Sequence, residues 1–141
     1  MLSKTALSVV KALVYLADQP EGAYVGAGEI AKNIGAGQNY LGKILQFMTH
    51  EELVQSQKGL GGGFRLARPA KEICLFDAVD PIDHVSRWDG CFLTHGSCTA
   101  DHPCTIHDKW RNVRRTYLDF LKNTTIAELS HPGSIQISIP K

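Results

Sequence analysis

The chain has 141 residues, of which 43% are hydrophobic and 21% are charged, and its formal net charge is +1. This is the composition of one ordinary globular domain with an appended element. No apolar run reaches the roughly 20 residues that a membrane helix needs, and the first four residues lack the basic start of a signal peptide. We therefore expect a cytoplasmic protein without a membrane partner.

The charge is unevenly distributed along the chain. Residues 1–71 hold eight Lys and Arg against five acidic residues, a net charge of +3, whereas residues 72–141 hold seven against nine, a net charge of −2. This asymmetry fits a nucleic-acid-binding module joined to a sensing or pairing module. Chance variation in solvated charge would explain it equally well.

A first helix is predicted to follow Ser3, which suits an N-cap, and to run to about Asp18 before Pro20 and Gly22 end it. Its apolar residues recur at steps of three and four and predict one buried stripe: Leu7, Val10, Leu13, Val14 and Ala17.

A helix-turn-helix is predicted next. A short helix spans about Glu29 to Ile34, the Gly-Ala-Gly of residues 35–37 breaks it, and a second helix runs from Gln38 to Glu51. The inner face of this second helix consists of Leu41, Ile44, Leu45 and Met48. Its first turns hold the residue types that read base edges and bind phosphates, namely Gln38, Asn39, Tyr40 and Lys43. Packing of Tyr40 and simple solvation of Lys43 remain alternatives.

A basic β-hairpin, or wing, is predicted after this motif. Residues 53–57 have an extended pattern, and four glycines lie within the five residues 59–63. A nucleotide-binding loop would need a Gly-Lys-Ser/Thr ending and a following helix, and the chain has neither here. We predict that the wing contacts DNA through Lys58, Gly61, Gly62 and Arg65.

The segment 73–82 is predicted to be helical up to Pro81 and to pack on the three-helix core. Cys74 lies within it, and we expect a buried core residue there rather than a ligand.

Three further cysteines, Cys91, Cys98 and Cys104, occupy an aperiodic segment, and His107 follows closely. Structural disulfides are rare in a reducing compartment, so this clustering indicates metal or redox chemistry. The Cys-x6-Cys-x5-Cys spacing lacks the paired knuckles of zinc sites, which favours an iron-sulfur cluster over zinc. His107 is the best fourth ligand by position. A metal-free thiol switch remains open.

A long amphipathic helix is predicted from about Thr105 to Lys122. Large apolar residues recur along one face: Ile106, Trp110, Val113, Tyr117, Phe120 and Leu121. Such a helix needs a partner surface, and its copy in a second subunit is the simplest one, although it could instead fold back on its own domain. Thr125 and Glu128 have capping-box spacing for one more short helix, and a loose tail follows.

The expected fold is therefore mainly α with a small β-hairpin. It comprises a winged helix-turn-helix domain (residues 1–86), a cysteine-rich cluster-binding loop (87–104), a dimerisation helix with a short C-terminal helix (105–130) and a tail (131–141).

Together these elements resemble the IscR/NsrR-type family of winged-helix iron-sulfur regulators. The resemblance covers nearly the whole chain and rests on the recognition-helix start 39–41, the wing 58–64, the three-cysteine loop, the stretch 104–110 and the ending 120–129. It implies a homodimer paired through the long helix, with two clusters and two heads that grip a pseudo-palindromic operator.

Two departures from the family pattern matter. The first cysteine interval is one residue longer than is common. Some members hold a 4Fe-4S cluster with an acidic ligand from the partner's first helix, but Ala6, Leu7 and Ser8 offer no carboxylate. This favours His107 as a ligand and a 2Fe-2S cluster, while members without any cluster also exist.

The resulting hypothesis is a homodimeric regulator of transcription, a repressor, whose operator affinity is controlled by a cluster that senses redox state, nitric oxide or iron status. It has no enzymatic activity and no small-molecule substrate. The alternatives are a cluster-free regulator gated by thiol oxidation or a small ligand, and an iron-sulfur electron carrier.

Overall fold

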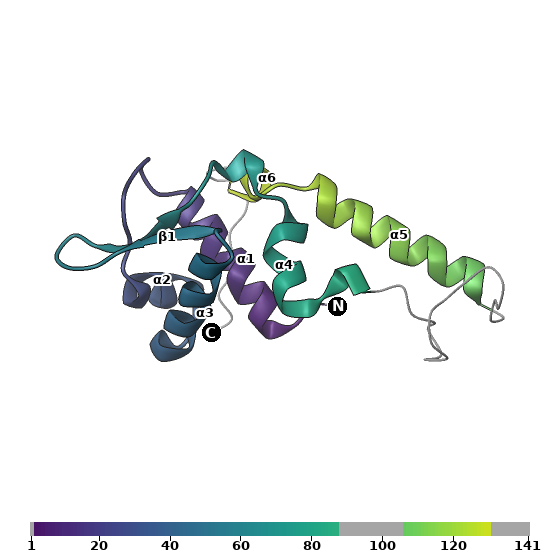
Figure 1. The fold of residues 1–141 in the computed structure, drawn as a ribbon, viewed down its shortest axis with the longest axis horizontal. Helices are drawn as coiled ribbons and strands as arrows, with labels where there is room; N and C mark the ends of the chain where they lie inside the picture. Colours follow the sequence, from purple (N-terminus) through teal and green to yellow (C-terminus); the bar gives the residue numbers. More distant parts are fainter. Residues whose placement is uncertain (1, 88–105, 131–141) are drawn as a thin grey trace.

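The computed structural model describes residues 2–87 and 106–130, and within them the chain is mainly helical with one β-hairpin (Figure 1). This confirms the expected fold class. The predicted cysteine-rich segment, apart from Arg87, and the tail lie outside the described residues. The elements in chain order are α1 (Lys4–Ala17), α2 (Ala27–Ile34), α3 (Gln38–His50), β1 (Val54–Gln57), β2 (Gly63–Leu66), η1 (Ala70–Glu72), α4 (Leu75–Asp83), η2 (Val85–Arg87), α5 (His107–Asn123) and α6 (Ile126–Leu129).

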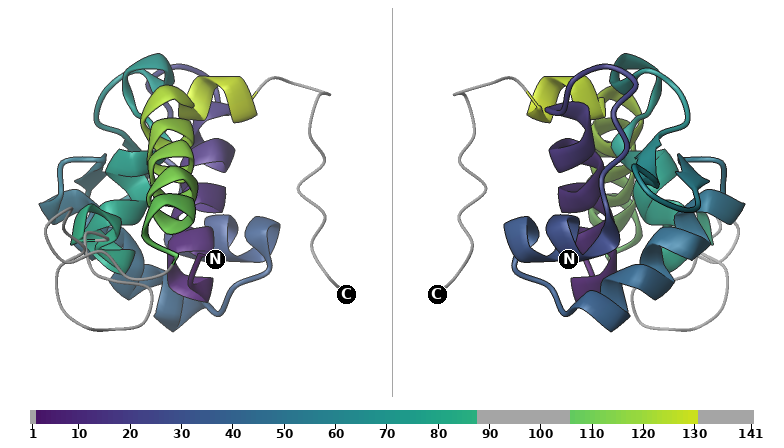
Figure 2. Two further views of the ribbon diagram at one scale, coloured as in Figure 1. Left: turned by 90° about the vertical axis from the view of Figure 1, so that its right-hand side faces the viewer. Right: turned by 90° about the vertical axis from the view of Figure 1, so that its left-hand side faces the viewer.

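Helix α1 lies at the centre of the domain and contacts α2, α3, α4, α6 and β2 (Figure 2). The side chain of Ser3 accepts a hydrogen bond of 3.1 Å from the Ala6 amide, so the predicted N-cap is confirmed. The predicted stripe is confirmed at Leu13 and Val14, which are buried, and Val10 and Ala17 are partly buried against the core, but Leu7 is 43% exposed. A helix with neighbours on several sides buries several faces, here through Ala6, Val9, Ala12, Leu13, Val14 and Leu16.

The predicted helix-turn-helix is confirmed. Helix α2 ends at Gly35, whose φ of +74° is left-handed and therefore favours glycine, and α3 begins directly after Gly37. The apolar faces of the two helices are buried in one core, with Ile30, Ala31 and Ile34 from α2 and Leu41, Ile44, Leu45 and Met48 from α3. This packing leaves the opposite face of α3 in solvent.

The wing is an antiparallel pair of strands in which Val54 faces Leu66 and Gln57 faces Gly63. The connection between α1 and α2 adds one more pairing, since Val25 and Phe64 exchange two backbone hydrogen bonds of 2.8 Å. A Cβ on Gly63, whose φ is +140°, would lie 2.4 Å from the Val25 carbonyl oxygen. Glycine at this position thus allows the wing to be anchored on the domain.

Helix α4 runs two residues beyond the predicted end at Pro81. Proline removes one backbone hydrogen bond, but the helix continues because His84 donates to the Asp80 carbonyl at 2.8 Å and Asp83 is held by α1. The carboxylate of Asp83 accepts hydrogen bonds from the amide and the hydroxyl of Ser3. These contacts join the end of α4 to the start of α1.

Cys74 differs from its prediction as a core residue. It is the half-buried N-cap of α4, where the Asp77 carboxylate accepts a hydrogen bond of 3.2 Å from its amide. Burial raises the pKa of its thiol.

Helix α5 is attached to the domain at its C-terminal end and extends away from the helix-turn-helix (Figure 1). The attachment is backbone pairing: Leu75 donates to the Thr124 carbonyl and Ile126 donates to the Ile73 carbonyl, both at 2.8 Å. Near this end Leu121 is fully buried and the ammonium of Lys122 lies 5.0 Å from the centre of the Phe76 ring. The predicted capping box of Thr125 and Glu128 opens α6 and is confirmed. Among the described residues, no helix is long and apolar enough to span a membrane.

Candidate nucleic-acid interface

The outer face of α3 is polar and exposed. Gln38, Asn39 and Lys43 point into solvent, while the apolar residues between them are buried in the core. Gly37 has no side chain that could cap α3, so the N-cap residue satisfies none of the first-turn amides at the positive end of the helix dipole. An exposed helix start with amide and amine side chains is suited to contact phosphates and base edges.

Tyr40 makes the packing contact that the sequence leaves open as an alternative, and part of it remains exposed. Its hydroxyl lies 2.6 Å from the hydroxyl of Thr5 on α1, yet 40% of the residue is exposed. Gln38 is also held in place, since a Cβ added at Gly28 of α2 would lie 3.2 Å from its side-chain nitrogen. The first turn of α3 is therefore positioned by both α1 and α2.

The two basic residues of the wing have different surroundings. Lys58 is exposed at the end of β1. The guanidinium of Arg65, in contrast, lies 4.6 Å from the centre of the Tyr24 ring and donates to the Gln55 side chain at 3.1 Å and to the Gly22 carbonyl at 3.4 Å. Arg65 consequently braces the base of the wing, and Lys58 is the wing cation with the greater freedom to bind a phosphate.

The wing glycines Gly61 and Gly62 differ in the space around them. Gly61 has a φ of +74° and open space where a side chain would be, whereas a Cβ on Gly62 would lie 2.2 Å from the carbonyl oxygen of Gln57. Gly62 is thus needed for the turn itself.

Three residues beside the predicted ones were missed by the sequence analysis, and two of them, Gln46 and Leu60, are exposed. Gln46 lies one turn beyond Lys43 on the outer face of α3, and Gly42 lies on the helix between Asn39 and Gln46. Leu60 is fully exposed at the tip of the wing. The spacing of residues 39, 43 and 46 by four and three was a usable signal for Gln46.

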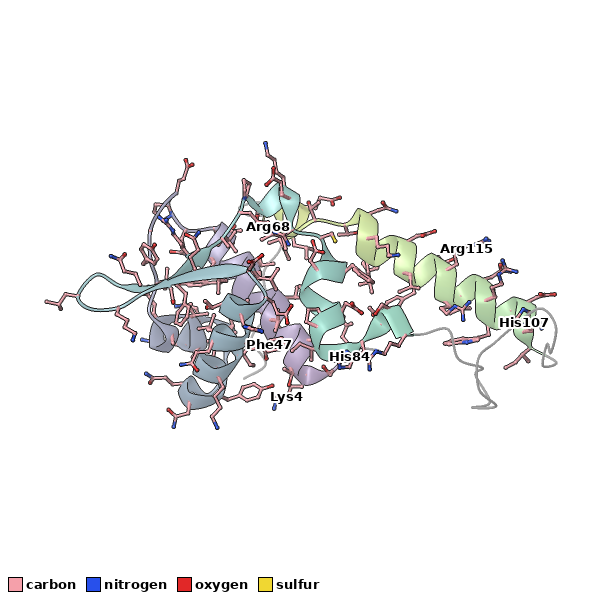
Figure 3. All side chains as sticks on the ribbon, viewed as in Figure 1. Lys4, Phe47, Arg68, His84, His107 and Arg115 are labelled. Carbon is pink, nitrogen blue, oxygen red and sulfur yellow. The ribbon has the colours of Figure 1, made fainter. Side chains whose placement is uncertain are left out.

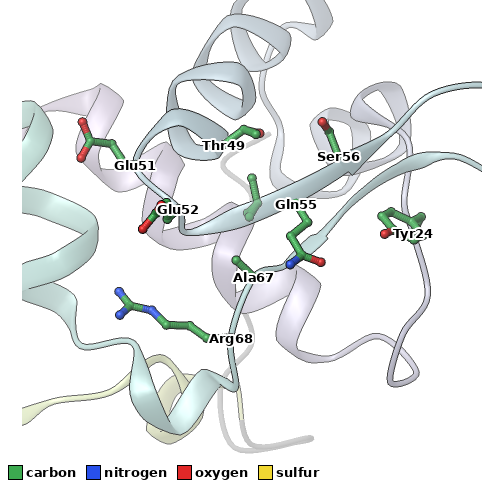
Figure 4. Close-up of a pocket in the computed structure, with 9 residues that line it drawn as sticks. Tyr24, Thr49, Glu51, Glu52, Gln55, Ser56, Ala67 and Arg68 are labelled. Carbon is green, nitrogen blue, oxygen red and sulfur yellow. The ribbon is translucent and has the colours of Figure 1, made fainter.

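A shallow hollow lies beneath β1 and carries acidic side chains (Figure 4). It is lined by Glu51 and Glu52, which repel phosphates, and by Arg68, which is paired with Asp77 at 3.5 Å. The hollow includes part of β1, and its two carboxylates make it less suited to a phosphate backbone than the outer face of α3.

His107, the predicted fourth metal ligand, is the first residue of α5 and is only 7% exposed. Figure 3 labels it at the end of α5 that lies far from α3. Cys91, Cys98 and Cys104 lie outside the described residues, and within residues 2–87 and 106–130 no three His, Cys, Asp or Glu side chains gather as a metal site. Of the predicted ligands, the described residues include His107 alone, a buried imidazole at the start of α5. An imidazole is a donor compatible with an iron-sulfur cluster.

Helix α5 packs against α4, and its Tyr117 is partly buried against the core of the domain. Burial raises the pKa of this phenol, and the nearby carboxylate of Asp83 raises it further. Because Asp83 also holds Ser3, this region connects α5 to the N-terminus of α1.

Residues 2–132 match a protein family, Rrf2, that is described as iron-dependent transcriptional regulators. The chain belongs to the Rrf2 family. A helix-turn-helix-type transcriptional regulator of Aquifex aeolicus is 32% identical over 131 residues, which are 92% of this chain and 90% of that protein. Protein aau3 of Rhizobium meliloti is 33% identical over 129 residues, which are 91% and 83% of the two chains.

Solved structures share the fold of this Rrf2 protein. CymR of B. subtilis, named as the global cysteine regulator, has a TM-score of 0.78 at 18% identity and is matched over 92% of this chain and 95% of its own. IscR of T. potens has a TM-score of 0.75 at 22% identity, over 96% and 92%. The oxidised form of Staphylococcus aureus CymR has a TM-score of 0.73 at 21% identity, over 96% and 99%. The predicted resemblance to winged-helix regulators is thereby confirmed.

Proposed function

We propose that this Rrf2 protein is a homodimeric repressor of transcription that binds a pseudo-palindromic DNA operator and whose affinity depends on an iron-sulfur cluster. The observation that carries the DNA-binding part is the exposed polar face of α3 beside a wing that is anchored by Val25 and Arg65. In this arrangement α3 enters the major groove, with Gln38, Asn39, Tyr40 and Lys43 toward base edges and phosphates. Lys58 contacts the backbone or the minor groove.

The dimer is proposed to form through α5. Its apolar residues alternate at intervals of four and three, the spacing of a seam between paired helices. Val113 is 59% exposed and Phe120 is 52% exposed, so two large apolar side chains of this seam are not covered by the chain's own domain. Two copies that join these faces would bury them. The seam consists of Ile106, Trp110, Val113, Tyr117 and Phe120.

The sensor is proposed to be the segment that carries Cys91, Cys98 and Cys104, with His107 as the fourth ligand. Three thiolates and an imidazole are a donor set for a 2Fe-2S cluster, which would supply redox and iron sensitivity when bound. The family description as iron-dependent supports this assignment. His107 begins α5, so ligation there would act on the helix that joins the two subunits.

The second candidate is a regulator without a cluster that is gated by thiol oxidation or a small ligand. Its support is the similarity of fold to CymR proteins, one of them solved in an oxidised form. In both candidates the DNA-binding residues have the same role.

Purification without oxygen separates the two candidates. Iron, zinc and acid-labile sulfide are measured on the native protein and on Cys98→Ala, with Cys74→Ala as the control because Cys74 lies at the start of α4. We expect iron and sulfide in the native protein and in the control but not in Cys98→Ala. We also expect operator affinity to change about 5- to 150-fold in Cys98→Ala, as for a coupling of about 1 to 3 kcal/mol. An iron-free native protein that binds DNA and responds to oxidation would favour the second candidate.

A further inference from the structure

Gly42 is unusual among the glycines of the helix-turn-helix because it lies inside a helix and no contact in the domain explains it. It lies in the interior of α3, where glycine is less favourable than alanine because the unfolded chain has more freedom to lose. A Cβ built at Gly42 meets no atom within 4 Å. Gly28 is different, since a Cβ there would press on Gln38 at 3.2 Å. The absence of a side chain at position 42 therefore weakens the helix without relieving any crowding within the described residues.

The residues that flank Gly42 on α3 indicate a role for the missing side chain. Residues three and four apart lie side by side on a helix surface, so Gly42 lies between Asn39 and Gln46. Both flanking side chains are exposed polar amides. Gly42 is thus a position without a side chain, flanked along the helix by two side chains of the type that read base edges.

The dimensions of DNA make the missing side chain at position 42 important for how closely α3 can approach a base pair. The major groove is about 12 Å wide and a helix with its side chains is about 10 to 12 Å across, so the two surfaces meet closely. A position without a side chain lets the helix backbone approach a base pair more closely there than alanine would allow. The neighbouring amides can then reach deeper into the groove.

We propose that Gly42 is a specificity determinant: its bare backbone receives the edge of one base pair in the major groove, and a methyl group there prevents that approach. This inference rests on the proposed DNA binding by α3 and adds the position at which the helix and the DNA come closest. It assigns a role to a residue with no functional group, and it explains why a less favourable helix residue stands in the interior of α3 beside the exposed Asn39 and Gln46.

The test is Gly42→Ala, because the proposal requires stability and binding to change in opposite directions. The full-length protein is used, and the probes are a duplex selected by the wild-type protein from a random-sequence pool and mixed-sequence DNA. We expect the melting temperature to rise by a few degrees, since alanine favours the helix. We expect affinity for the selected duplex to fall about tenfold, the scale of one overpacked contact, and affinity for mixed-sequence DNA to stay unchanged.

Gly26→Ala is the matched control. Gly26 is the exposed N-cap of α2 and also has open space around a built Cβ, but it does not lie on α3. We expect this variant to bind both probes as the wild type does. Equal affinity of Gly42→Ala for the selected duplex, or an equal loss on both probes, would overturn the proposal. If the wild-type protein selects no duplex over mixed-sequence DNA, the proposed function itself fails.

Discussion

The hydroxyl groups of Thr5 and Tyr40 lie 2.6 Å apart, which joins the first turn of α1 to the first turn of α3. The same end of α1 is held by Asp83 at the end of α4, through the amide of Ser3 at 2.9 Å. Asp83 in turn lies close enough to Tyr117 of α5 to raise the pKa of that phenol. The start of α1 thus contacts α3 directly, and it is linked to α5 only through Asp83 of α4.

Tyr40→Phe tests the first of these contacts. The variant keeps the ring and loses the hydroxyl, so we expect a stability loss of about 0.5 to 1 kcal/mol and a weaker hold on the start of α3. Operator affinity, measured by fluorescence anisotropy, should fall several-fold. Tyr15→Phe is the matched control, since it loses a hydrogen bond of 3.4 Å to Glu29 that lies away from α3. A Tyr40→Phe protein that binds DNA as tightly as Tyr15→Phe would show that the contact does not position α3.

Lys58→Ala tests the wing. Because Lys58 is exposed, its loss should leave thermal stability unchanged. Each phosphate contact releases counterions, so the slope of log affinity against log salt should become shallower by about 1, equally for operator and for unrelated DNA. Lys71→Ala, an exposed lysine in η1, should leave the slope as it is. An unchanged slope in Lys58→Ala would remove this residue from the interface.

Much of the fold could be predicted because local signals and tertiary packing agree. Ser3 caps α1, the Gly-Ala-Gly of residues 35–37 separates α2 from α3, and the capping box at Thr125 opens α6. Each is a short-range preference that acts within a few residues of the chain. The same is true of the glycine-rich wing, where Gly62 and Gly63 have no room for a Cβ.

The errors have a common physical origin in contacts between distant segments. Leu7 fits a helical stripe, but α1 is surrounded on other faces, so periodicity alone wrongly included Leu7 and missed buried residues such as Ala6 and Val9. Pro81 suggested a helix end, whereas the contact of Asp83 with Ser3, 80 residues away in the chain, holds the last turn. Arg65 is predicted to contact DNA from the wing, and the structure adds a neighbour that the sequence did not indicate, the Tyr24 ring from the connection between α1 and α2. Sequence periodicity gives no information about these contacts between distant residues.

Val113→Glu tests the proposed dimer. Because Val113 is 59% exposed, a charge there should leave the fold of the monomer intact. In a buried seam the same carboxylate would be desolvated without a partner, so we expect dissociation and a large loss of operator affinity. Sedimentation equilibrium measures the first effect. Arg115→Glu, on the exposed side of α5, is the control and should sediment as the wild type. If Val113→Glu also keeps the wild-type mass, α5 is not the subunit contact through this face.

Cys74 offers a test of the domain that does not depend on DNA or a cluster. Burial raises its pKa above the ordinary value of 9.0, so the folded protein holds the thiol proton more tightly than the unfolded chain does. The stability that this group contributes is fully present below the unfolded pKa and is lost as pH rises through the folded pKa. Because the thiolate is the reactive form, alkylation of Cys74 in the native protein should reach half its maximal rate at a higher pH than in urea. Peptide-level mass spectrometry distinguishes Cys74 from the other three cysteines, and equal pH midpoints in the two states would show that the N-cap of α4 is open to water.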